Sequence, residues 1–229
     1  MFRSLLLAAF TVIVLPAQSP PAPEPTPTKP TAPTVTVTVP TFANPTCPIM
    51  GKKVSMPLFV DTDVGRFYVC CKPCYKKILA DLPAAHKTAY PVVQAVKNTH
   101  CPVSGEAIGE GAVEVTLQGY RFSVCCAGCV DAARQHSQVT LLKVTQPNVK
   151  DVGNATCPVT GTATVPNAFA LVDAALVHLS SPKAADELAK DPATALAKAQ
   201  AIAKAQPSKP KHEHQKAAKK DEKAPEAGK

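Results

Sequence analysis

A cluster of cysteines that occurs twice is the feature that most limits what this chain can fold into. Residues 67–74 read FYVCCKPC and residues 122–129 read FSVCCAGC. Upstream of each copy stands a CPxxG segment, at residues 47–51 and 101–105. Because β-branched and aromatic residues favour strands, each copy predicts a strand that leads into two adjacent cysteines and then a short helix. Four thiols thus recur twice, and they can hold a metal, pair as disulfides or do redox chemistry.

The spacing of these cysteines extends to a third copy. Segments that open with asparagine and reach Cys-Pro occur at residues 44–48, 98–102 and 154–158, and their cysteines are 54 and 56 residues apart. Such self-similarity at a fixed period indicates a repeat architecture. In the third copy Ser180, Ser181 and Ala184 stand where the first has its CCxxC cysteines, so only the cysteine of the CPxxG segment remains.

Each repeat predicts two short strands around a glycine-bearing turn, followed by a helix. We therefore predict an α+β fold of three tandem small units, treble-clef-like or zinc-ribbon-like, each a β-hairpin plus a short helix. Ser180 or Ser181 and Asp191 are expected to cap the helices of the third unit. The predicted elements are strands at 58–61 and 66–69, strands at 113–117 and 120–124, helices at 73–79 (ending near Pro83) and 128–135, and helices at 182–190 and 192–205.

Composition divides the chain into six predicted segments. They are a secretory signal peptide at 1–19, a Pro-rich linker at 20–43, unit 1 at 44–97, unit 2 at 98–150, a degenerate unit 3 at 151–206 and a disordered basic tail at 207–229. Ten prolines lie in the stretch from Pro16 to Pro45, which favours an extended linker. The tail is rich in charge and lacks periodicity, so we interpret His212 and His214 as part of a solvated tail, with weak metal binding as the alternative.

The N-terminus is typical of an export signal. Arg3 precedes an apolar run at residues 5–15, which small residues follow. This run is shorter than the roughly 20 apolar residues that span a bilayer. We expect a periplasmic or extracellular protein with no stable membrane insertion after signal cleavage; an uncleaved anchor is the alternative.

Charge and motif content argue against two large function classes. The net charge of +8 is scattered along the chain, and this pattern does not favour a nucleic-acid partner. The sequence has no paired carboxylates beside its histidines and no Gly-rich phosphate loop, so we do not expect an enzyme. With 5% aromatic residues and no tryptophan, units of this size bury little area and need a metal or a disulfide as a staple.

Metal is the stronger staple, since a structural zinc contributes about 10–16 kcal/mol in small peptides and a disulfide about 2–4 kcal/mol. A CPxxG turn presents one thiolate together with backbone N–H groups. A CxxC that enters a helix presents two more, and the positive helix end is expected to lower their pKa. A full zinc knuckle has a second cysteine in the turn, where this chain has Met50, Ser104 and Thr160. Since adjacent residues rarely aim at one ion, we expect three thiolates per site.

Three thiolates suit a soft ion. Cu(I) prefers thiolates and the thioether that Met50 offers, and Zn(II) can complete its tetrahedron with water. His100 is a further candidate ligand, although a surface or capping role is the simpler interpretation.

The cysteine pattern resembles the TRASH/YHS-like family of small cysteine-rich domains, which are associated with heavy-metal sensing, trafficking and resistance. That family shows one cysteine, a spacer, and then CxxxC; the CPVSG opening and the tyrosines Tyr68 and Tyr120 also match. The resemblance covers two intact units, and binding is not carried over to the third. It implies about one Cu(I) or Zn(II) per intact unit, with the ligands Cys47, Cys70, Cys74, Cys101, Cys125 and Cys129 and the additional candidates Cys71, Cys126 and Met50.

We therefore expect an exported heavy-metal-binding protein that acts in sequestration, trafficking or resistance, with a metal-donor or metal-acceptor protein as partner. The alternative is a disulfide-stabilised or structural-zinc interaction module, because exported cysteines often pair. Two disulfides in each intact unit would pair eight of the nine cysteines and leave Cys157 unpaired. Thiol–disulfide catalysis has less support, since no βαβ context surrounds Cys71 and Cys74.

Overall fold

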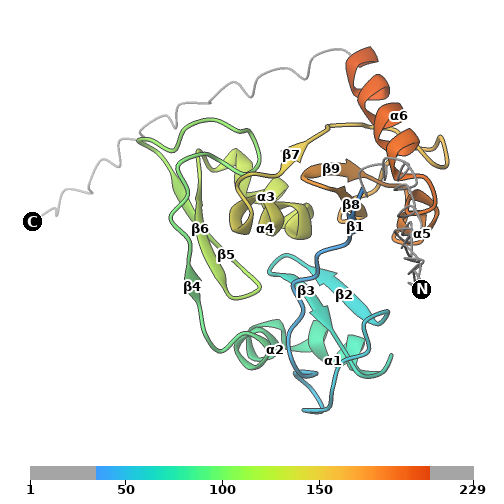
Figure 1. The fold of residues 1–229 in the computed structure, drawn as a ribbon. Coiled ribbons are helices and arrows are strands. Elements are labelled where there is room, and N and C mark those ends of the chain that lie inside the picture. Colours follow the sequence, from blue (N-terminus) through green and yellow to red (C-terminus); the bar gives the residue numbers. More distant parts are fainter. Residues whose placement is uncertain (1–34, 207–229) are drawn as a thin grey trace, which may run out of the picture. The chain divides into compact units, whose positions relative to one another are not determined.

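A computed structural model describes residues 35–206, a mixed α+β chain with small sheets (Figure 1). The expected signal peptide and basic tail, with His212 and His214, lie outside the described residues. In chain order the elements are β1 Val37–Thr38, β2 Phe59–Thr62, β3 Gly65–Tyr68, α1 Cys74–Ala80, α2 Leu82–Ala89, β4 Gln94–Ala95, β5 Val113–Leu117, β6 Tyr120–Val124, α3 Gly128–Gln135, α4 Ser137–Thr145, β7 Lys150–Asp151, β8 Phe169–Val172, β9 Ala175–His178, α5 Ala184–Leu188 and α6 Pro192–Ala205.

Three antiparallel hairpins recur along the chain: β2 with β3, β5 with β6, and β8 with β9. The second hairpin has the predicted bounds. The first is shifted by one residue, because Gly65 pairs with Thr62 and so belongs to the ladder rather than to the turn. The Thr62 hydroxyl donates to the Gly65 carbonyl (2.8 Å), which closes a two-residue turn.

The segments that precede the hairpins add short edge strands to them. β4 runs parallel to β6, and β7 runs parallel to β9 in the same way. β1, which falls within the expected linker 20–43, pairs antiparallel with β8 of the third hairpin. The sheets therefore have the strand orders β2-β3, β4-β6-β5 and β1-β8-β9-β7.

Each hairpin is followed by two helices, so the prediction of a single short helix in the first two units was wrong. Pro83 does not end a helix; it stands in the first turn of α2, where proline is tolerated because no N–H bond is needed. Asp81 caps α2 by accepting from the Ala84 N–H. The predicted cap at Asp191 is confirmed by the same contact to Thr194, whereas the predicted caps at Ser180 and Ser181 are wrong, since α5 begins at Ala184 with no side-chain cap.

Three asparagines at equivalent positions tie each opening segment to its hairpin. The side chain of Asn44 accepts from the Tyr68 N–H (2.8 Å) and donates to the Tyr68 carbonyl (2.9 Å). Asn98 makes the same pair of bonds to Ser123, and Asn154 makes it to His178. Each amide thus satisfies the backbone N–H and carbonyl of one hairpin residue, as a paired strand would, and we call these residues the asparagine clamps.

Each hairpin has its own hydrophobic core, in which the cysteines take part. Cys47 and Cys74 belong to the first core, Cys101 and Cys129 to the second, and Cys157 to the third. A fourth cluster joins Val139 and Leu142 of α4 to residues of the third hairpin. Burial of the cysteines fixes their side chains and places them where water does not compete for the sulfur atoms.

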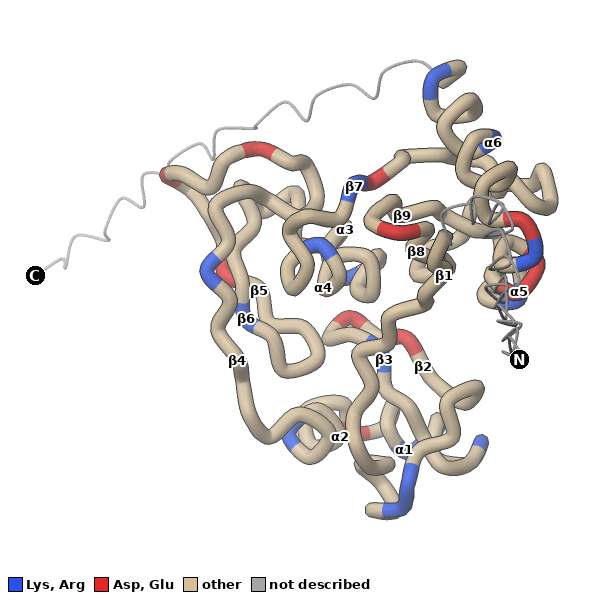
Figure 2. The backbone as a smooth tube through the Cα atoms, viewed as in Figure 1, with Lys and Arg blue, Asp and Glu red and all other residues tan. Residues whose placement is uncertain are grey.

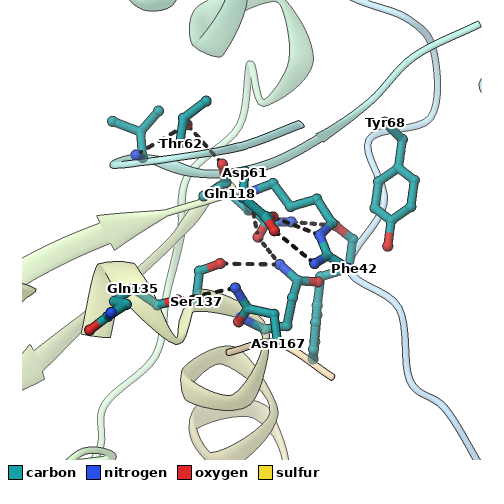
Figure 3. Close-up of polar contacts among 12 residues, drawn as sticks. Phe42, Asp61, Thr62, Tyr68, Gln118, Gln135, Ser137 and Asn167 are labelled. Carbon is teal, nitrogen blue, oxygen red and sulfur yellow. Dashed lines mark hydrogen bonds and ion pairs between the residues drawn. The ribbon is translucent and has the colours of Figure 1, made fainter. Parts of the chain in front are cut away.

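A buried amide network joins neighbouring hairpins (Figure 3). Gln118, at the tip of the second hairpin, accepts from the Arg66 N–H (3.1 Å) and donates to the Phe42 carbonyl (2.5 Å). Its oxygen also accepts from the side chain of Gln138, and Asn167 of the third repeat accepts from the Gln138 N–H (2.9 Å). All these polar groups find partners, so the junction between repeats is specific.

Candidate metal centres

Six cysteines gather into two groups of three. The sulfur atoms of Cys47, Cys70 and Cys74 all lie within 4.8 Å of one another, and so do those of Cys101, Cys125 and Cys129. We call these groups the first and second triads. The structure therefore brings together the six cysteines that the sequence singles out, and either triad could hold a metal ion.

The CPxxG turn supplies the first thiol of each triad. The Gly51 N–H donates to the Cys47 carbonyl (2.8 Å), and the Cys47 N–H donates to the Lys52 carbonyl (2.8 Å). Gly51 has a φ of +65°, which glycine adopts without the steric cost that other residues pay. The turns at Cys101 and Cys157 make the same two bonds.

The hairpin end and the helix start supply the other two thiols. Cys70 follows β3, and Cys74 is the first residue of α1. A turn joins them, in which the Cys74 N–H donates to the Cys71 carbonyl (3.2 Å). In the second unit the Cys129 N–H donates to the Cys126 carbonyl (3.1 Å). Three different elements thus converge on each triad: the CPxxG turn, the hairpin end and the helix start.

The cysteine of each CPxxG turn has a pKa near neutral pH. Burial acts to raise the pKa of Cys47, but backbone N–H groups of Cys70, Ile49 and Met50 outweigh it and bring the pKa to about 7. Backbone N–H groups likewise outweigh burial at Cys101 and bring its pKa to about 7. At Cys157 the side chain of Thr160, followed by backbone N–H groups, outweighs burial and brings the pKa to about 7.

The thiols at the helix starts do not have the lowered pKa that the sequence predicted. Burial, followed by neighbouring thiols, raises the pKa of Cys74, and burial likewise raises the pKa of Cys129. The predicted lowering by the helix start was therefore wrong for these two residues. Burial disfavours the charged thiolate at both positions, and a negative charge at the turn cysteine adds to this effect by opposing a second charge nearby. A cation between the sulfurs would remove this opposition.

The cysteines outside the triads also lie close to them. The sulfur of Cys71 is 3.4 Å from that of Cys74 and 3.9 Å from that of Cys70. The sulfur of Cys126 is 3.8 Å from that of Cys129. These distances are far above the S–S bond length of about 2.05 Å, and all nine cysteines, every one within the described residues, are free thiols.

The position of the missing fourth cysteine differs among the repeats. Ser104 places its hydroxyl 3.3 Å from the sulfur of Cys125, whereas Met50 is 49% exposed. In the third repeat the Thr160 and Ser180 hydroxyls lie 2.8 Å apart. The sequence predicted that these positions lack a cysteine, but it did not predict the hydroxyl contacts. These contacts join residues about 20 positions apart, and no sequence pattern indicates them.

His100 is not brought into either triad. Its Nδ1 lies 3.0 Å from the Thr99 hydroxyl, and the residue is exposed. Cys157 is fully buried, and no other cysteine occupies a triad position around it, since Ser180 and Ala184 stand there. The third repeat therefore keeps the turn and its cysteine but lacks the other two ligands.

Charge is spread over the described residues. Figure 2 shows Lys and Arg on many separate elements, interspersed with Asp and Glu. Between residues 35 and 206 no helix combines the length and the apolar character that crossing a membrane requires.

Comparison with known proteins adds nothing to what the residues themselves indicate. No protein-family model matches the sequence, and no match was found among curated proteins or among solved structures.

Proposed function

We propose that this chain is an exported heavy-metal-binding protein that acts in metal sequestration, trafficking or resistance. The observation that carries the proposal is the convergence of three free thiols, twice, from a turn, a hairpin end and a helix start. Metal sites of this kind need sulfur ligands held at fixed positions that lose their protons when the ion binds, and the two triads supply such sulfur atoms.

The donor set selects a soft ion. Thiolates favour Cu(I) and Zn(II) over hard cations, which prefer oxygen ligands. Each triad offers three sulfurs, so Cu(I) can be held in a plane and Zn(II) needs one further ligand, such as water. We expect about one ion per triad, which gives about two ions per chain.

We also propose that the chain contains three repeated units, two of which carry a metal site. Three tandem treble-clef-like or zinc-ribbon-like units, two intact and one degenerate, account for the recurring turns, asparagine clamps and hairpins. The resemblance to TRASH/YHS-like domains supports a role in metal handling rather than catalysis. Export would place the chain where a metal-donor or metal-acceptor protein could exchange ions with it.

The test is a metal count on the full chain. Protein purified reduced and without oxygen is titrated with Cu(I) and, separately, with Zn(II), and bound metal is measured by mass spectrometry. Cys74→Ser and Cys129→Ser should each remove the ion of one triad, and Cys157→Ser is the matched control because this buried thiol belongs to neither triad. Metal-free protein, or equal loss in the control, would sink the proposal.

A second candidate function is an interaction module in which metal only stabilises the fold. The third repeat favours this view, because a Thr160–Ser180 hydroxyl contact replaces the sulfur cluster while the hairpin persists. Circular dichroism of the triad variants separates the two. A chain that stays folded but binds no metal has a transport or storage role, and a chain that unfolds uses the metal as a staple.

A further inference from the structure

Each cysteine cluster contains a second triangle of sulfurs beside its triad. In the second unit the sulfur separations are 3.9 Å for Cys125–Cys126, 3.8 Å for Cys126–Cys129 and 3.6 Å for Cys125–Cys129. The three atoms therefore form a nearly equilateral triangle. In the first unit Cys71 stands in the same relation to its neighbours, 3.9 Å from Cys70 and 3.4 Å from Cys74.

The triangle has the size that a metal ion requires. An ion at its centre would lie about 2.2 Å from each sulfur, close to the metal–thiolate distance of about 2.3 Å. The adjacent cysteines reach this geometry because the chain turns between the hairpin and the helix, with the Cys129 N–H bonded to the Cys126 carbonyl. Neighbouring residues do aim at a common point here.

The second triangle shares one edge with the triad. Cys125 and Cys129 belong to both groups, so their thiolates would bridge the two ions. Cys101 and Cys126 would each bind a single ion. Cys126 is half-buried, whereas the three thiols of the triad are buried, so the second position lies nearer to solvent than the first.

We propose that each cluster holds a second Cu(I) ion, through Cys70, Cys71 and Cys74 in the first unit and Cys125, Cys126 and Cys129 in the second. This inference rests on the proposed metal-binding function and specifies its ion and capacity. Two singly charged ions fit close together between four thiolates. Two Zn(II) ions would repel each other four times as strongly, and each would need four ligands.

The test compares copper capacity in the full-length reduced chain. Under anaerobic conditions, Cu(I) is titrated against a chromogenic chelator that competes for it, and the bound copper is counted. Wild type should hold about four Cu(I), and Cys71→Ser/Cys126→Ser should hold about two, because both triads remain. Cys157→Ser is the control and should keep the wild-type capacity. Circular dichroism verifies folding, which these two half-buried positions should not disturb.

X-ray absorption spectroscopy tests for the second copper ion directly in the wild-type protein. Copper-saturated wild type should show scattering from a second copper beside the sulfur shell. Two copper ions per chain in both wild type and the double variant, with no copper–copper scattering, would overturn the second site and leave the proposed function standing. No copper in wild type would overturn both.

Discussion

The hydroxyl of Thr160 lies 2.8 Å from the hydroxyl of Ser180, in the place where the second repeat has Ser104 beside Cys125. The backbone around these pairs is the same, since the Ala184 N–H bonds to the Ser181 carbonyl (3.1 Å) just as the helix-start cysteines bond in the other repeats. The third repeat thus has the backbone geometry of a site but keeps only one of its three sulfurs, that of Cys157.

This relationship predicts that a site can be restored. Ser180→Cys/Ala184→Cys should complete a triad with Cys157, whose pKa is about 7, and raise the metal capacity by about one ion per chain. Bound metal in the purified variant provides the measurement. The control Lys183→Cys/Asp186→Cys adds two thiols at exposed positions that match no cysteine of the other repeats. An equal gain of bound metal in the control would show that added thiols bind metal wherever they stand, and would contradict the prediction.

The asparagine clamp of the third repeat should be a major source of its stability. Asn154→Ala removes three hydrogen bonds and leaves the N–H and carbonyl of His178 without that partner, so we expect a loss of about 3 kcal/mol in the free energy of unfolding. Chemical denaturation measures it. Asn148→Ala changes an exposed asparagine and should cost less than about 0.5 kcal/mol. Similar losses in both would argue against the clamp.

Gln118 should hold the first two hairpins together. Gln118→Asn keeps the amide and tolerates the φ of +46°, but its shorter side chain cannot reach Arg66 and Phe42, so we expect a loss of about 2 kcal/mol. Hydrogen exchange at the Arg66 N–H should accelerate. Gln146→Ala, at an exposed glutamine, is the control. Unchanged exchange at Arg66 would contradict the role of this junction.

Acid should weaken the link between α4 and the third hairpin. Burial acts to raise the pKa of Asp151, but His178 (2.8 Å) and Lys143 (2.6 Å) outweigh it and hold that pKa well below its usual range. A carboxylate with a lowered folded pKa stabilises the fold above its unfolded pKa of about 4, and this stability is lost as the pH falls below that value.

Asp151→Asn should therefore cost about 1–2 kcal/mol at pH 7, and the difference from wild type should shrink as the pH falls below about 4. Urea denaturation across this range measures it. Glu187→Gln, which removes an exposed pair with Lys190, should change stability by less than about 0.5 kcal/mol. A constant difference at every pH would count against the Asp151 account.

The sequence predicted the second hairpin well because Gln118 and Gly119 form a two-residue turn that fixes its register. It missed α4, whose β-branched residues resemble a strand. Seven of its nine residues are buried, so no polar face marks a helical period. Tertiary packing decides its structure. Sequence reasoning also missed α2, because a proline such as Pro83 can either end a helix or stand in its first turn.

The candidate site was predicted more completely than the fold around it. The resemblance to TRASH/YHS-like domains implied the six cysteines that form the two triads, and the recurring turn and helix start already pointed to thiols that converge. Two features needed coordinates. The sulfurs of Cys125 and Cys126 converge on Cys129 although the residues are adjacent. The asparagine clamps were visible only as a recurring letter at positions 44, 98 and 154.

The most direct measurement of the central claim is X-ray absorption at the metal edge of the full reduced chain, loaded with one ion per triad. The account predicts a nearest shell of about three sulfur atoms at roughly 2.3 Å in wild type. That shell should lose sulfur when Cys74 and Cys129 are both changed to Ser. A shell of nitrogen or oxygen atoms, or the same sulfur shell in the double variant, would contradict it.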